Sequence, residues 1–353
     1  MHLRSLLAAA SLLTLTTGAV LPGQDDPYVG YLLSTFTDVN PQVFWYLSNA
    51  SNPLAFTALN GGNPVLESTV GTQAVRDIFL ASNPEKSEYF VIATDLDINA
   101  AGFSWDEATR RGSRGLTIWR SDNLIDWSEP TLSIIEDPTA GMAWAPSVVY
   151  NTTESQYYLF WASRLYSPAD PSHTGTASLD RIRYTTTKDF ITFAPATDYL
   201  ALDEENIPLI DQEFLPIKSH SDEDEQEGEG EAGESYIRFL KDETVLHVYQ
   251  ETSTTGLLGP WTRSPSPNNS GGYIATTVFE GPAAFPDISV PGRYYLLLDN
   301  YEQYVPFRTD DVLSGGWEEV DAAAVGFPEG LKHGNVVVLK RSEYEKVLER
   351  FGG

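Results

Sequence analysis

The chain contains no cysteine, only two methionines, and only 22 basic residues against 50 acidic ones. Without cysteine no disulfide framework can form, so the fold must rely on its hydrophobic core. The net charge of −28 repels phosphate backbones and anionic lipid surfaces, so neither nucleic acid nor a membrane is an expected partner. Neutral substrates are not excluded. The 353 residues are enough for one large domain.

Long hydrophobic runs are also lacking, and the apolar stretch near the N-terminus is short. It covers Leu6–Leu15, follows Arg4 and precedes the small residues Thr17-Gly18-Ala19. This arrangement is typical of a cleavable secretory signal, and the stretch is too short to span a bilayer. We therefore expect a signal peptide over residues 1–19 and a secreted, extracellular protein. Export agrees with three sequons for N-glycosylation, at Asn49, Asn151 and Asn268.

Short runs rich in Val, Ile, Tyr, Phe and Thr predict strands, and they recur in groups of four. A repeat of roughly 50–70 residues built of four strands is typical of a β-propeller blade. The groups open with VRDIFLA (Asp77), AWAPSVVY (Trp144), LIDQEFL (Asp211), FEGPAAF (Glu280) and KHGNVVVL (His333). Their later strands are predicted to begin near Tyr89, Leu116, Tyr157, Arg181, Phe193, Ser235, Val245, Trp261, Arg293, Val305 and Trp317.

The fifth group is split between the two ends of the chain. Its other three strands are predicted from Gly30, Gln42 and Ala55. The chain over residues 20–353 is therefore predicted to be one all-β domain, a five-bladed β-propeller closed by N- and C-terminal strands that share one blade. An open sandwich of loosely similar hairpins is the competing interpretation.

Two segments break the strand pattern. Residues 342–350 are the only part predicted to be helical, as a short C-terminal cap. Residues 219–235 (SHSDEDEQEGEGEAGES) are almost all acidic, Gly or Ser and cannot bury apolar area, so a disordered hairpin insertion is predicted. Weak calcium capture or a role at the mouth of the funnel is the alternative for this insertion.

Three acids, Asp77, Asp211 and Glu280, stand near the starts of predicted innermost strands. Side chains at one position of such a repeat would converge on one central funnel. Cleavage of a glycosidic bond needs one protonated and one ionised carboxyl group, and a third acid nearby can keep the proton donor protonated. The alternative is that these acids cap strands or form hydrogen bonds between blades.

The motifs VRDIFLA, AWAPSVVY, LIDQEFL, FEGPAAF and KHGNV, in this order from about Gly30 to Leu339, resemble those of glycoside hydrolase family 43. The resemblance implies a propeller enzyme that hydrolyses arabinofuranosides, xylosides or galactosides with inversion. It implies that Asp77 is the general base and Glu280 the general acid. Asp211 would then orient Glu280 and modulate its protonation.

Two features depart from the family pattern. Ser147 follows the WAP motif, where many relatives have an acid, and this substitution affects a substrate contact rather than the three acids. The acidic insertion after Lys218 would restrict access to the funnel.

Three further residues are candidates for substrate binding. Trp144 would stack on a sugar or pack between blades. His333 would bind a hydroxyl, or help to hold a calcium ion or other cation near the channel axis, as in some relatives. Arg308 ends an aromatic strand and would reach the substrate or form a surface salt bridge. No metal ligand is assigned, and no cofactor is required.

The expected activity is that of an exo-acting, monomeric α-L-arabinofuranosidase-like enzyme on plant cell-wall-type polysaccharides or oligosaccharides. A β-xylosidase, a galactofuranosidase or a galactosidase of the same family stays open, as does a non-catalytic carbohydrate-binding propeller. Propellers that hydrolyse fructosides typically carry Asn-Asp-Pro and Glu-Cys motifs, and this chain has neither.

Overall fold

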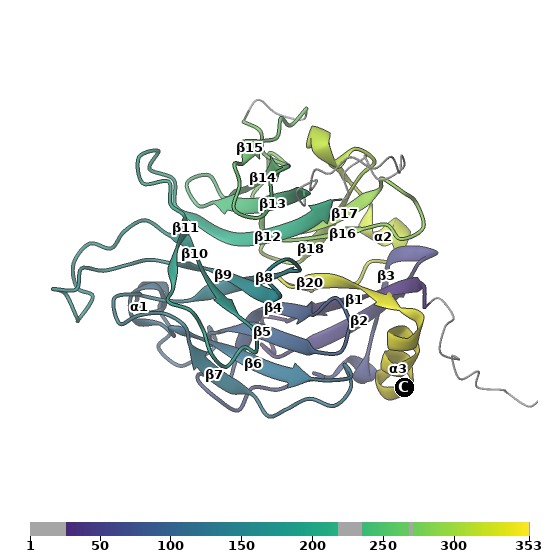
Figure 1. The fold of residues 1–353 in the computed structure, drawn as a ribbon, viewed down its shortest axis with the longest axis horizontal. Helices are drawn as coiled ribbons and strands as arrows, with labels where there is room; N and C mark the ends of the chain where they lie inside the picture. Colours follow the sequence, from purple (N-terminus) through teal and green to yellow (C-terminus); the bar gives the residue numbers. More distant parts are fainter. Residues whose placement is uncertain (1–25, 218–234, 268–270, 353) are drawn as a thin grey trace, which may run out of the picture.

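The structure is a computed structural model that describes residues 26–217, 235–267 and 271–352. Its strands form five four-stranded antiparallel sheets arranged as the blades of a ring (Figure 1). The predicted all-β, five-bladed propeller is confirmed. The predicted signal peptide, the acidic insertion apart from Ser235, and the sequon at Asn268 lie outside the described residues.

Four blades follow one another along the chain. Blade 1 contains β4 (Val75–Ser82), β5 (Tyr89–Asp95), β6 (Gly115–Ser121) and β7 (Thr131–Ile134). Blade 2 contains β8 (Trp144–Asn151), β9 (Gln156–Ser163), β10 (Arg181–Thr187) and β11 (Thr197–Leu200). Blade 3 contains β12 (Leu209–Ile217), β13 (Ser235–Asp242), β14 (His247–Ser253) and β15 (Thr262–Arg263). Blade 4 contains β16 (Glu280–Pro286), β17 (Tyr294–Asp299), β18 (Tyr304–Thr309) and β19 (Glu318–Glu319).

Blade 5 joins the two ends of the chain, as predicted. Its order is β20 (Asn335–Lys340), β1 (Tyr28–Thr35), β2 (Phe44–Asn49) and β3 (Asn52–Ala58), and β20 lies beside β1 in Figure 1. The buried Asn335 side chain accepts a hydrogen bond from the Leu80 N–H at 2.8 Å and donates to the Leu80 carbonyl oxygen at 3.1 Å. These bonds tie blade 5 to blade 1 and close the ring.

The hydrophobic core consists of five clusters, one between each pair of neighbouring blades. Large aromatic residues recur in them, such as Trp45 and Trp119 between blades 5 and 1, or Phe239 and Trp317 between blades 3 and 4. Burying one such side chain contributes about 1.5–3 kcal/mol. Aromatic packing between blades therefore stabilises a fold that has no disulfide.

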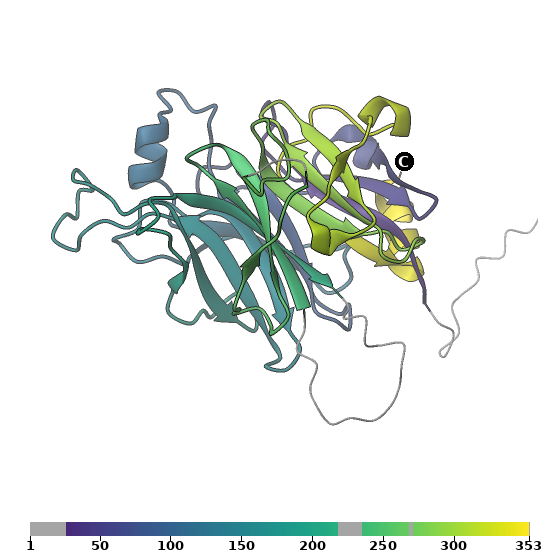
Figure 2. The same cartoon turned by 90° about the horizontal axis from the view of Figure 1, so that it is seen from above.

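The helices are only partly as predicted. The C-terminal helix α3 (Arg341–Phe351) is confirmed, but α1 (Trp105–Arg111) and α2 (Ala322–Val325) were not expected, nor were the 3₁₀ turns Asn60–Gly62 and Val312–Ser314. Helix α1 lies between β5 and β6 and projects, in blue, from the upper face of the ring in Figure 2. No helix in the described part of the chain is long and apolar enough to cross a membrane.

One predicted strand start was wrong. The outer strand of blade 2 begins at Thr197 and not near Phe193, because Phe193 forms only an isolated bridge with Thr187.

The innermost strands of blades 1 to 4 share a bulge near their beginnings. The pairing register shifts directly after Arg76, Trp144, Ile210 and Glu280. The next residue in each strand has a left-handed backbone, with φ of 50° at Asp77, 52° at Ala145, 53° at Asp211 and 56° at Gly281. The three acids therefore do not occupy one repeat position, as the sequence had suggested, because Glu280 precedes the left-handed residue while Asp77 and Asp211 are that residue.

The attachment points of the acidic insertion lie away from the funnel. Ile217 and Ser235 flank it and pair with each other at the end of blade 3 opposite Asp211. The predicted restriction of the funnel concerns a segment outside the described residues, apart from Ser235, and stays a prediction.

Candidate active site

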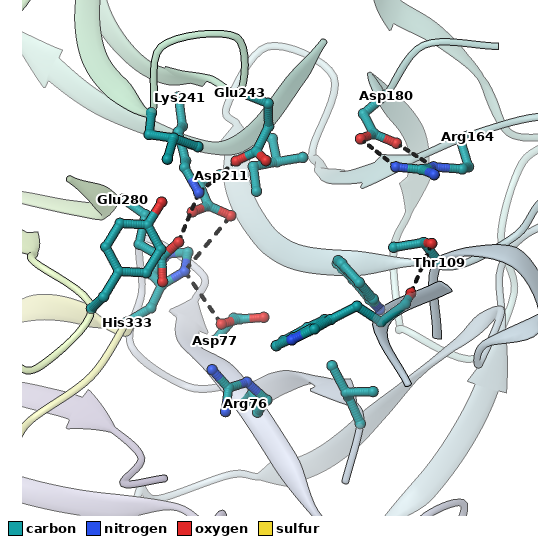
Figure 3. Close-up of a pocket in the computed structure, with 16 residues that line it drawn as sticks. Arg76, Asp77, Thr109, Arg164, Asp180, Asp211, Lys241, Glu243, Glu280 and His333 are labelled. Atoms are coloured by element: carbon teal, nitrogen blue, oxygen red, sulfur yellow. Dashed lines mark hydrogen bonds and ion pairs between the residues drawn. The ribbon is translucent and has the colours of Figure 1, made fainter. Parts of the chain in front are cut away.

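A cavity of about 380 Å³ lies where the innermost strands begin (Figure 3). All five blades contribute to its wall through residues at or just before these strands, namely Asp77, Trp144, Asp211, Glu280 and His333. The three acids predicted to be catalytic are thus brought together with Trp144 and His333.

His333 lies between two of the acids. Its Nδ1 atom is 3.4 Å from Oδ1 of Asp77 and 4.0 Å from Oδ1 of Asp211 (Figure 3). Burial opposes the charge of the imidazole, but the carboxyl groups of Asp211 and Asp77 outweigh it and raise the pKa of His333 to about 9. At neutral pH this ring is therefore a cation that bridges two carboxyl groups.

Asp77 is held in its ionised form. Burial alone would raise its pKa, but the hydrogen bond from His333, the charges of His333 and Arg76, and the hydroxyl of Thr94 together lower the pKa below the ordinary value. The Thr94 hydroxyl donates to Oδ2 of Asp77 at 2.7 Å and accepts from the Ala145 N–H at 2.8 Å. Thr94 thus connects the acid to the next blade.

Asp211 behaves differently from Asp77. Burial, with the charges of Glu280 and Asp77, raises the pKa of Asp211 to about 7, although His333 and Lys241 act in the opposite direction. Its Oδ2 atom accepts a hydrogen bond from the Gly281 N–H at 3.0 Å. Asp211 therefore fixes the backbone directly after Glu280 and also makes a hydrogen bond between blades, which was the structural alternative.

Glu280 is bound by a lysine that the sequence did not single out. Lys241, at the end of β13, donates to Oε2 of Glu280 at 2.7 Å and forms an ion pair with Glu243 at 2.5 Å. The Lys241 ammonium also lies 5.1 Å from the ring centre of Tyr301. Burial would lower the pKa of Lys241, but the charges of Glu280, Asp211 and Glu243 raise it, so the side chain stays a cation.

The opposite end of the cavity was also missed by sequence reasoning. Arg164 and Asp180 form a bidentate pair there, with both N–O distances 2.7 Å. Thr109 of α1 lies toward the same end in Figure 3, and its hydroxyl donates to the carbonyl oxygen of Trp105 at 2.9 Å. Trp105 also lines the cavity, and its ring lies 6.0 Å from that of Trp144 in an edge-to-face arrangement.

Arg308 does not line this cavity. It lies in β18, the third strand of its blade, 4.0 Å from the carboxylate of Glu318, and it borders a separate cavity. The predicted substrate contact of Arg308 is therefore corrected to the surface-pair alternative, because the third strand of a blade stands away from the axis.

The sequence also suggested a cation near the channel axis. Among the described residues, no group of three or more His, Cys, Asp or Glu side chains is arranged to hold a metal ion. A cation near the channel axis stays a prediction.

Comparison with known proteins assigns the family. A family described as a probable glycosyl hydrolase domain, related to glycoside hydrolase family 43, matches residues 26–345. The chain belongs to this family of glycoside hydrolases. The resemblance inferred from the five motifs is thereby confirmed.

Individual proteins are similar to this glycoside hydrolase over only part of its length. An α-L-arabinofuranosidase of Bifidobacterium longum subsp. longum is 30% identical over 181 residues, which cover 47% of the chain and 17% of that protein. The chain thus spans less than a fifth of that relative's length. A thermostable family-43 glycoside hydrolase is 14% identical with a TM-score of 0.44, covering 72% of this chain and 73% of that one. An exo-β-1,3-galactanase from Phanerochaete chrysosporium is 10% identical with a TM-score of 0.45, covering 83% and 54%.

The glycoside hydrolase is expected to lose stability as the pH rises from about 6.5 to about 9. Unfolded histidine titrates near pH 6.5, whereas His333 in the folded chain has a pKa of about 9. The folded state therefore binds this proton more tightly, and the stabilisation is complete below about pH 6.5 and is lost as the pH passes about 9. Denaturant unfolding at about pH 6, 8 and 10 should show a decreasing free energy of unfolding.

Two variants test whether His333 causes this pH dependence of stability. His333→Gln should flatten it, whereas His247→Gln, which alters a histidine outside the cavity beside Tyr273, should keep the wild-type slope. Equal slopes for wild type and His333→Gln would contradict the assignment.

Gly281→Ala is expected to damage activity through His333. A Cβ atom at this position would lie 2.7 Å from Cγ of His333, and the backbone φ is 56°. A left-handed alanine costs on the order of 1–3 kcal/mol, and the contact would also displace the imidazole. The matched control is Gly326→Ala, where φ is 71° and no atom lies within 4 Å. We expect both variants to lose stability and only Gly281→Ala to lose most of its kcat; equal kcat values would contradict the prediction.

Proposed function

We propose that this glycoside hydrolase is a secreted enzyme that removes terminal α-L-arabinofuranosyl residues from polysaccharides or oligosaccharides with inversion. The observation that carries the proposal is the convergence of Asp77, Asp211 and Glu280 around His333 in one cavity. The arabinofuranosidase relative supports the choice of sugar.

The geometry suits a single displacement by water. Asp77, ionised at neutral pH, accepts a proton from a water molecule as that water attacks the anomeric carbon. The bond from this carbon to the leaving oxygen breaks in the same step, and Glu280 gives its proton to that oxygen. Asp211 holds the Gly281 N–H and so fixes the strand that carries Glu280.

The charges in the cavity favour a neutral sugar. The chain carries a net charge of −28, but the cavity is lined by nearly equal numbers of acidic and basic side chains. Its carboxyl groups are Asp77, Asp180, Asp211, Glu243 and Glu280, and its cations are Arg76, Arg164, Lys241 and His333. A uronic acid or a sugar phosphate would disturb this balance, whereas arabinose would not.

The test is a panel of 4-nitrophenyl glycosides, with the anomer of the released sugar followed by NMR. We expect the α-L-arabinofuranoside to be cleaved first and its β anomer to appear initially. Faster cleavage of the β-D-xylopyranoside or β-D-galactofuranoside would change the sugar assigned as substrate. Initial release of the α anomer from the α-L-arabinofuranoside would contradict inversion. Binding of arabinose without release from any substrate would favour a carbohydrate-binding propeller.

Secretion is part of the same proposal. It rests on Arg4, the apolar run Leu6–Leu15 and the small residues that follow. Expression of the full chain in a eukaryotic secretory host should yield protein in the medium whose N-terminus lies near Val20. Retention inside the cell with an intact N-terminus would contradict export.

A further inference from the structure

We propose that the cavity wall formed by Trp105, Arg164 and Asp180 recognises the glycone, the sugar that is released, and not the leaving group. The inference rests on the proposed glycosidase function and adds to it the residues that select the sugar.

The position of this wall relative to Glu280 is the first argument. Figure 3 places Arg164, Asp180 and Thr109 across the cavity from Glu280 and Lys241. Because Glu280 donates its proton to the leaving oxygen, the leaving group departs beside Glu280. The far wall therefore faces the ring of the sugar whose anomeric carbon is attacked.

Trp105 offers an aromatic surface at this wall. The residue is 55% exposed although tryptophan is large and apolar, and it lines the cavity. Phe103 and Trp144 contact it edge-on, with ring centres 4.9 Å and 6.0 Å away and planes at 85° and 76°. These contacts fix the orientation of the indole, and an exposed, oriented aromatic face suits the C–H surface of a sugar ring.

Arg164 and Asp180 supply polar groups in the same cavity. The bidentate pair places N–H donors next to carboxylate acceptors, and the Asp180 side chain is 10% exposed. Neighbouring sugar hydroxyls both donate and accept, so this combination suits two adjacent hydroxyls. Because the two charges cancel, the pair adds no preference for a charged ligand.

Helix α1 holds Trp105 in place before any ligand arrives. Arg110 donates to the carbonyl oxygens of His173 and Gly175, at 2.9 Å and 3.1 Å, and Arg111 donates to that of Ser172 at 2.9 Å. The His173 ring in turn lies 2.6 Å from the Arg110 carbonyl oxygen. Because these hydrogen bonds hold α1 against the loop of the next blade, Trp105 is pre-organised, and this lowers the entropic cost of binding.

The test compares substrates that share the cleaved glycone but differ in the leaving group. With 4-nitrophenyl, methyl and oligosaccharide leaving groups, Trp105→Ala should lower kcat/KM by the same factor, on the order of tenfold. The inhibition constant of the released monosaccharide should rise by that factor too. Trp105→Phe should recover most of the loss, and Asp180→Asn, which weakens the bidentate pair, should act in the same direction as Trp105→Ala.

Leu313→Ala is the matched control, since Leu313 is 54% exposed and does not line the cavity; we expect no change. A loss confined to oligosaccharide leaving groups would overturn the inference by assigning the wall to the leaving group. Unchanged kcat/KM on every substrate would also overturn it. If the wild type cleaves no glycoside at all, the proposed function fails, and this result is distinct from either outcome.

Discussion

Replacing Asp77 by asparagine is expected to lower kcat by on the order of 10²–10⁴-fold or more while the fold persists. The carboxylate of Asp77 has a lowered pKa and faces the cavity, so it is the group best placed to accept a proton from water. An amide of the same shape cannot accept that proton. The loss should be similar for all leaving groups, because the water must be activated in each case.

Asparagine is chosen because of the backbone at this position. Asp77 has φ of 50°, a left-handed conformation that asparagine tolerates far better than alanine. The amide oxygen can still accept the hydrogen bond from Thr94, so the connection to Ala145 in blade 2 is kept. The expected change is therefore chemical and not architectural.

The control for Asp77→Asn is Asp310→Asn, which alters an exposed carboxylate paired with Arg293 outside the cavity. Turnover, circular dichroism and thermal unfolding should be measured for both variants. Near-normal turnover of Asp77→Asn would remove it as the general base. An unfolded Asp77→Asn variant would instead indicate that its hydrogen bonds between blades are its main role.

The ring of blades could be predicted from sequence because its signals are local. Each strand is a short β-branched and aromatic run, and each blade repeats the same four runs. The split blade could be predicted from the number of strands per blade. The strand of KHGNVVVL needs three partner strands, and the three N-terminal runs supply them. Asn335, in that motif, makes the bonds that close the ring.

The detailed position of Glu280 could not be predicted in the same way. The bulges depend on a left-handed residue whose N–H is bound from the preceding blade, by Asp211 at Gly281 and by Thr94 at Ala145. These bonds cross between blades and leave no local pattern. The one sequence signal was Gly281 itself, which follows Glu280 where the other two motifs have the acid.

The sequence analysis identified neither Lys241 nor the residues of the far wall. Lys241 and Glu280 lie in different blades, and nothing in the chain near either residue indicates the pairing. Trp105 did have a signal: Ser104 precedes it, acids fill the first turn of α1 and arginines the last, in the order that stabilises a helix. Arg308 was misplaced because sequence gives the order of strands in a blade but not which side chains reach the axis.

The second large effect concerns the proton donor. Glu280→Gln is expected to lower kcat by on the order of 10²–10⁴-fold for methyl or oligosaccharide leaving groups. The loss should be much smaller for a 2,4-dinitrophenyl leaving group, because that phenolate departs without needing a proton. Lys241 binds Oε2 of Glu280, so Oε1 is the oxygen that can carry the donated proton. This dependence on the leaving group separates Glu280 from Asp77, whose loss is the same for every substrate.

Asp211→Asn is the matched variant, because Asp211 has a pKa of about 7 and could itself hold a proton near neutrality. Asp211 contacts the Gly281 N–H and His333. These contacts position other residues of the site and do not involve the leaving oxygen. We therefore expect Asp211→Asn to reduce kcat by a similar factor for good and poor leaving groups, and to shift the pH dependence of kcat/KM. If Asp211→Asn instead spares only the dinitrophenyl substrate while Glu280→Gln impairs all substrates equally, the two roles must be exchanged. In that case the proton on Asp211 would be the one transferred to the leaving oxygen.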